Sequence, residues 1–188
     1  YEVSIMIYTL LPPNDPRVLS SVAEFDIERY KDEEKIELKE FVANMFETMK
    51  KYGGIGLSAN QVGKPYRMFI MGDHPNISNG KKWVCINPKI TNVTKDLIRY
   101  KEGCLTFPFL FLDIERPQDI SVEYLDENLE KKEEHMTGIV ARCFQHEFDH
   151  MQGIVFTEHV SKLKLEMALK KRDKQIKKVQ KQWQTASN

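Results

Sequence analysis

The chain has 188 residues, of which 41% are hydrophobic, and its 28 basic residues balance 28 acidic ones. This profile fits one globular domain, or one domain followed by an extra helix. No apolar run approaches the roughly 20 residues of a membrane span, which argues against a membrane-spanning protein and a membrane partner. Three widely spaced cysteines favour a reducing compartment over a disulfide framework.

Apolar periodicity predicts three helices and five short strands, in the order of an α+β fold with mixed or antiparallel sheets. The first helix covers 33–51 and ends at two glycines. Strands are predicted at 67–71, 83–86, 110–114 and 120–125. A turn at 126–128 leads into a polar edge strand at 129–136. The second helix runs from Thr137, a candidate N-cap, to Gly153, a candidate stop. The third helix covers 161–183.

The third helix carries most of the charge asymmetry. Nine Lys or Arg residues follow position 160, against Glu166 and Asp173 alone. The tail is therefore near +7 and the rest of the chain near −7. Such asymmetry is typical of a surface that binds a polyanion, but it also fits a solvated, lysine-rich helix. Both interpretations stay open.

The clearest local motif is HEFDH, from His146 to His150. Residues four apart share one face of a helix, so the two histidines can bind one metal ion together. Glu147 lies beside them, within reach of a water molecule on that ion. The alternative is a pair of structural histidines on a half-buried helix.

The third ligand decides the class of site. The metzincin pattern would place a histidine at position 156, where this chain has Phe156. The downstream acids Glu158 and Glu166 do not lie in a convincing second helix. Cys104, in the segment EGCL, is the better candidate, although a free cysteine is more often a small buried hydrophobe. A glycine-rich segment, GIGLSANQ from Gly54, allows a close approach of its backbone to a partner.

Together these segments resemble the peptide deformylase family, which carries Gly-x-Gly-Leu-Ala-Ala-x-Gln, Glu-Gly-Cys-Leu-Ser and Gln-His-Glu-x-Asp-His-Leu in this order. The chain has GIGLSANQ, EGCLT from Glu102 and QHEFDHM from Gln145. Ser58, Thr106 and Met151 replace an alanine, a serine and a leucine of the family pattern. The resemblance extends from about residue 10 to 160. It implies a catalytic domain at 1–160, built around a central metal-binding helix, and a basic helical extension at 161–188.

The resemblance implies removal of the N-formyl group from the initiator methionine of nascent chains, with release of formate. It assigns Cys104, His146 and His150 to the metal, usually Fe²⁺, with Zn²⁺, Ni²⁺ or Co²⁺ as substitutes. Glu147 becomes the general acid and base, with the Gln61 amide and the Leu105 N–H stabilising the oxyanion. The residues expected at the methionine pocket or the docked peptide are Ile55, Gly56, Ile139 and Cys143.

The resemblance further implies that Arg116 pairs with Glu102 to hold the cysteine segment. The expected partners are N-formylmethionyl peptides and, through the basic helix, ribosomal RNA; no DNA is expected. The expected location is the cytoplasm of a bacterial or virus-infected bacterial cell, with an organelle as the alternative. The apolar run 109–112 lies near the site, where it can change how a peptide docks. Two other functions stay open, a metallopeptidase and an inactive module that binds N-terminal peptides or ribosomes.

Overall fold

The computed structural model describes residues 5–186, so the ends of both predicted units, 1–4 and 187–188, lie outside the described residues. Its larger sheet has five strands in the order β1-β2-β3-β6-β7, and its smaller sheet pairs β4 with β5. Every pairing is antiparallel among the described residues. The α+β class is therefore confirmed. Of the mixed and antiparallel sheets that the sequence allowed, the structure has antiparallel ones. The strands are β1 (Gly56–Ser58), β2 (Met68–Gly72), β3 (Lys82–Val93), β4 (Leu97–Cys104), β5 (Phe107–Pro117), β6 (Asp119–Leu125) and β7 (Lys131–Thr137).

Four helices accompany the sheets: α1 (Ile27–Glu33), α2 (Leu38–Lys51), α3 (Gly138–Met151) and α4 (Lys162–Ala186). The predicted start of the first helix at residue 33 is wrong, because Glu33 ends α1, a separate helix capped by the Asp26 side chain. Its predicted end is confirmed, since Gly53 follows α2 with a φ of +74°. Thr137 occupies the N-cap of α3, but its side chain makes no capping hydrogen bond.

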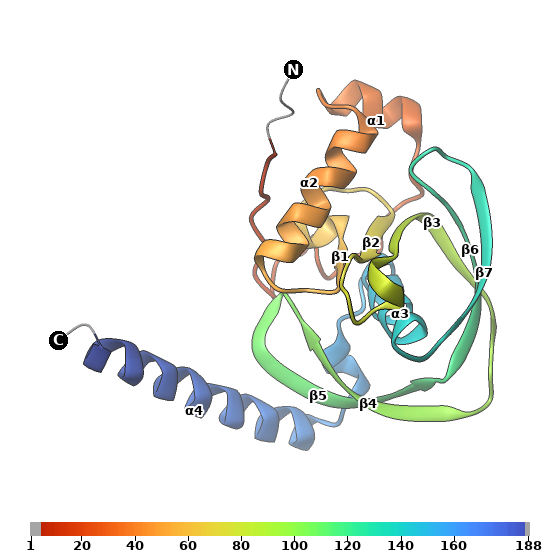
Figure 1. Cartoon of the computed structure of the whole chain (residues 1–188). Coiled ribbons are helices and arrows are strands. Elements are labelled where there is room, and N and C mark those ends of the chain that lie inside the picture. The colour runs from red at the N-terminus through yellow and green to blue at the C-terminus, as the bar shows by residue number, and fades with distance from the viewer. Residues whose placement is uncertain (1–4, 187–188) are drawn as a thin grey trace.

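Helix α3 lies between the two sheets (Figure 1). It packs on β1, β2, β6 and β7 of the larger sheet. The buried ring of Phe144 anchors it by meeting Phe69 of β2 edge to face, at 5.1 Å between ring centroids. Side chains of β4 and β5 reach the same helix from the smaller sheet. This position encloses the histidine-bearing face of α3, where His146 and His150 are buried.

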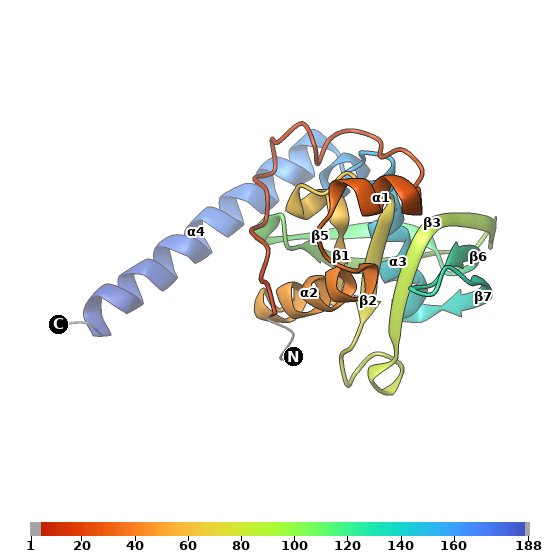
Figure 2. The ribbon, with the colours of Figure 1, turned by 90° about the horizontal axis from the view of Figure 1, so that it is seen from above.

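Helix α4 packs on the body near its start. Leu165, Ala168 and Leu169 contact the core formed by β5 and Phe156. The remainder of the helix projects away from the domain, as Figure 2 shows. No helix in the described part of the chain is both long and apolar enough to cross a membrane.

Candidate metal centre and active site

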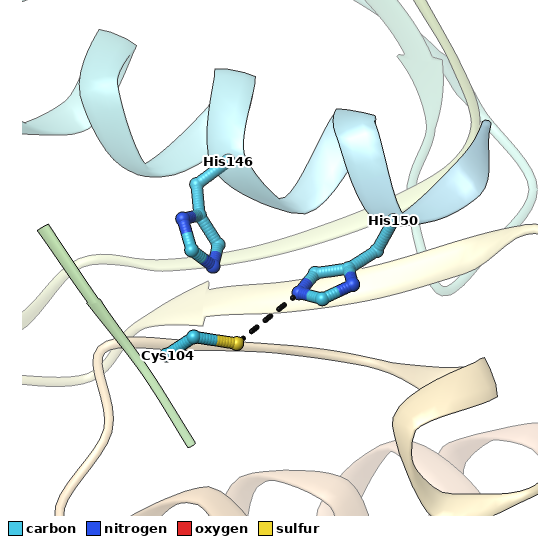
Figure 3. Close-up of side chains that lie close together, drawn as sticks. All are labelled: Cys104, His146 and His150. Carbon is cyan, nitrogen blue, oxygen red and sulfur yellow. Dashed lines mark hydrogen bonds between the residues drawn. The ribbon is translucent and has the colours of Figure 1, made fainter. Parts of the chain in front are cut away.

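Cys104, His146 and His150 lie at one point between β4 and α3 (Figure 3). Cys104 is the last residue of β4, and the two histidines lie one helical turn apart on α3. One donor atom from each residue lies within 4.8 Å of the others, and Cys104 Sγ is 3.5 Å from His150 Nε2. Segments more than 40 residues apart therefore supply one cluster.

The donor set and its spacing fit a divalent metal ion. Tetrahedral bonds of about 2.3 Å to sulfur and about 2.0–2.1 Å to nitrogen place the two donor atoms about 3.5 Å apart. The separation of Cys104 Sγ and His150 Nε2 has this value. One thiolate and two imidazoles leave the fourth tetrahedral position to a non-protein ligand, which is the pattern of catalytic rather than structural sites.

The electrostatics of the cluster favour a thiolate. Burial raises the pKa of the Cys104 thiol, but the adjacent His150 and His146 outweigh burial and lower this pKa well below its usual range. Burial lowers the pKa of His146, while its contacts with Cys104 and Glu102 raise it to about 10. With this pKa, His146 carries an extra proton at neutral pH when no metal is bound. Metal binding must displace that proton, so metal affinity falls as the pH decreases.

The Glu102 carboxylate is the centre of a buried ionic network. His146 Nδ1 lies 2.9 Å from Glu102 Oε1, and an ionised carboxylate only accepts, so this nitrogen donates and Nε2 remains for the metal. Arg116 donates to both carboxylate oxygens, at 2.7 and 2.9 Å. Burial raises the pKa of Glu102, but hydrogen bonds from His146 and Arg116 outweigh it and lower this pKa. The predicted pairing of Glu102 with Arg116 is present.

Arg142 and Asp149 complete this network, and sequence reasoning did not single out either residue. Arg142 Nη1 donates to Glu102 Oε2 at 2.6 Å and to the carbonyl of Ile114 at 2.9 Å. Asp149 accepts from Arg116 at 2.7 Å and lies 2.7 Å from His159 Nε2. Arg142 precedes His146 by four residues on the same helix, so helical spacing alone could have placed it on the metal-facing side.

Gln61 is oriented by two residues that depart from the family pattern. Its Oε1 accepts from the backbone N–H of Ser58 at 2.9 Å and from the Ser58 hydroxyl at 2.8 Å. Its Nε2 donates to Thr106 Oγ1 at 2.9 Å and lies 3.6 Å from Cys104 Sγ. The amide therefore faces the cysteine segment, with one N–H engaged by Thr106.

A cavity of about 510 Å³ opens beside the cluster. Of the ten site residues predicted from the sequence, nine line it, while His150 lies beneath, 1% exposed. The nine are Ile55, Gly56, Gln61, Cys104, Leu105, Ile139, Cys143, His146 and Glu147.

Glu147 lies on the wall of this cavity, where burial raises the pKa of its carboxyl to about 7, with His146 and His150 partly opposing the rise. Its Oε2 is buried without a hydrogen-bond partner in the described part of the chain. A Cβ at Gly56 would lie 2.5 Å from Glu147 Oε1, so only glycine lets β1 approach this carboxylate so closely. The predicted close approach of the glycine segment is therefore confirmed at Gly56.

Glu102→Gln should weaken metal binding about 10- to 100-fold, because it removes the charge that fixes the His146 tautomer. Competition with a chromophoric chelator measures the change, and circular dichroism checks that the fold persists. Glu115→Gln, on the exposed side of β5, is the matched control and should bind metal like the unmodified chain. Unchanged affinity in folded Glu102→Gln would contradict this role.

Comparison with known proteins identifies the architecture. The polypeptide deformylase family model matches residues 9–166. A peptide deformylase of Rhizorhabdus wittichii is 42% identical over 143 residues, covering 73% of this chain and 81% of the relative. That of Brucella suis is 36% identical over 169 residues, covering 90% and 92%.

Solved structures agree with this result. The peptide deformylase of Ehrlichia chaffeensis in complex with actinonin has a TM-score of 0.75 and 36% identity, covering 90% of this chain and 97% of that one. The Synechococcus elongatus peptide deformylase, also in complex with actinonin, has a TM-score of 0.78 and 33% identity, with 88% of each chain covered. The chain therefore belongs to the peptide deformylase family, whose members are metalloenzymes that remove N-formyl groups from nascent peptides.

Proposed function

We propose that Cys104, His146 and His150 hold the catalytic metal ion and that Glu147 moves the proton in deformylation of N-formylmethionyl peptides. The observation that carries this proposal is the convergence of three metal donors and a buried carboxylate on one cavity. A bound ion would act as a Lewis acid toward the formyl group and would make water more acidic.

Glu147 is the residue suited to accept a proton from the attacking water. Its unpartnered Oε2 and its place on the cavity wall support this role. The same carboxyl then delivers the proton to the departing amine nitrogen, so that water and the formamide become formate and a free amine. No other carboxylate lining the cavity is available in the described residues, since Glu102 is engaged by both arginines.

Gln61 is the residue suited to donate a hydrogen bond to the oxygen of the formyl group as negative charge develops there. Ser58 holds the amide oxygen, which leaves the NH₂ group facing the cavity. Thr106 engages one N–H, and the second has only the long contact with Cys104. The backbone N–H of Leu105 is proposed as the second donor, because Leu105 lines the same cavity next to Cys104.

The pocket for the methionine side chain is proposed to include Ile55, Gly56, Ile139 and Cys143, which share the cavity with Glu147. Burial raises the pKa of the Cys143 thiol well above its usual range, which keeps this wall uncharged and suits an apolar thioether. Ferrous iron is proposed as the working ion. The donor set also suits Zn²⁺, Ni²⁺ and Co²⁺, which would act as substitutes.

Glu147→Ala should lower kcat for formate release from formyl-Met-Ala-Ser by about 10²- to 10⁴-fold, because the general acid and base is lost. The assay is run without oxygen on protein loaded with Fe²⁺, and metal content is measured in parallel. Glu158→Ala, which changes an exposed carboxylate that does not line the cavity, is the control. A metal-loaded Glu147→Ala that keeps full activity would rule out the assigned role.

We further propose that α4 carries the enzyme to the ribosome. Its residues Leu165, Ala168 and Leu169 pack on the core, and the part beyond them bears exposed basic side chains. Their charge matches the phosphates of RNA, and neutralised phosphates make binding strongly dependent on salt. Six exposed lysines follow Leu169, and the four farthest along the helix are Lys174, Lys177, Lys178 and Lys181.

Exchanging these four lysines for glutamine should weaken ribosome binding. It should also reduce the steepness of the plot of log K against log salt concentration by about 3 to 4, or roughly 0.7–0.9 per lost phosphate contact. Sedimentation with ribosomes at several salt concentrations measures both quantities. The control exchanges four exposed lysines of α1, α2 and the segment between these helices: Lys31, Lys35, Lys39 and Lys51. Equal binding by both variants would refute the proposal.

A further inference from the structure

Phe109 adopts a backbone conformation that large side chains avoid. Its φ is +64°, in the left-handed region where glycine and asparagine are usual and where an aromatic residue is strained. The strain arises where β5 bulges, because the adjacent β4 residues Gly103 and Cys104 pair with Phe111 and Phe107. Five other non-glycine residues of the described chain have a positive φ, and none of them lines the active-site cavity.

The strain places an apolar side chain at the rim of the cavity. Phe109 is 54% exposed and Phe111 is 59% exposed, and both line the cavity that contains Glu147. Tyr52 and Ile139, also exposed, line the same cavity. Exposed apolar groups that gather around one opening are typical of a binding surface.

The polar groups of the cavity lie deeper than this rim. Glu102 and Glu147 are 6% and 4% exposed, so the reacting formyl group belongs at the base. A peptide bound there by its formyl end must leave through the mouth, so its residues after methionine pass the exposed apolar side chains. The only lysine and arginine that line the cavity in the described chain are Lys101 and the buried Arg142.

We propose that Phe109, with Phe111 and Tyr52, forms an apolar rim that selects formyl-methionyl peptides carrying a large apolar side chain directly after the methionine. This inference rests on the proposed placement of the formyl group beside Glu147. Strained backbone conformations are commonly found at active sites and ligand-binding sites, where they contribute to the mechanism. The strained bulge holds the Phe109 ring at the mouth of the cavity. An apolar side chain of the bound peptide would cover this ring and shield it from water.

The test compares formyl-Met-Phe-Ala with formyl-Met-Ser-Ala on the metal-loaded, full-length enzyme by formate release. We expect kcat/KM to be roughly tenfold higher for the phenylalanine peptide, because burying one apolar side chain against the rim typically changes specificity by about this factor. Phe109→Gly should bring the ratio of the two peptides close to one. The change should lie in KM rather than in kcat, because the contact is made equally in the ground and transition states.

Two controls separate recognition from a structural effect. Phe109→Tyr keeps the ring and should keep the preference. Leu97→Ala truncates an exposed apolar residue away from the cavity and should change neither peptide. Phe109→Gly should also have an equal or higher thermal midpoint, because glycine accepts a φ of +64° without strain.

Equal efficiency of the unmodified enzyme on both peptides would overturn the apolar rim alone. Preference that survives in Phe109→Gly, or a loss confined to kcat with a lower thermal midpoint, would also overturn it. Formate from neither peptide would overturn the proposed placement of the formyl group together with the rim.

Discussion

The geometry of the site depends on the ionic network around one buried carboxylate. Glu102 is held by Arg116 from β5, by Arg142 from α3 and by the His146 ring. Such a group would be costly to bury alone, and removing one partner would leave a charge uncompensated. The network therefore fixes β4 and β5 against α3 and sets the orientation of the His146 imidazole. Cys104 lies two residues after Glu102, so the same contacts place the thiolate.

A second set of contacts joins the larger sheet to this arrangement. Gln61 follows β1 and reaches across to Thr106, which follows Cys104, while Ser58 fixes the other end of its amide. Gly56 lets the same strand approach Glu147 closely. The wall of the cavity is thus formed by one glycine-rich segment, one segment after β4 and one helix. Ser58 and Thr106 together therefore set the orientation of the Gln61 amide.

The sequence predicts the parts of this arrangement that depend on local spacing. The histidine pair and Glu147 follow from helical periodicity, and most strands from apolar runs. The charged strand β4 and the seven-residue helix α1 were missed, because β4 is largely exposed and α1 buries only Tyr30. The segment around Cys104 made it a candidate ligand, and the family resemblance then assigned it to the metal, since no local pattern separates a ligand from a buried thiol.

Other features depend on tertiary contacts that no local pattern encodes. The role of Asp149 as a partner of Arg116 depends on how β5 packs against α3. The left-handed backbone at Phe109 depends on the register between β4 and β5, which periodicity does not define. The apolar run 109–112 lies within β5, and its side chains alternate between exposed and buried. Alternation places Phe109 and Phe111 at the rim, while Leu110 and Leu112 enter the core.

The central claim is that Cys104 supplies the thiolate of a metal centre with two histidines. The most direct test is the absorption spectrum of the Co²⁺-substituted protein, which reports both thiolate charge transfer and tetrahedral geometry. The account predicts a strong thiolate-to-cobalt band that is lost in Cys104→Ser and kept in Cys85→Ser and Cys143→Ser, whose thiols are buried outside the cluster. A band that survives Cys104→Ser, or no thiolate band in the unmodified protein with bound cobalt, would contradict it.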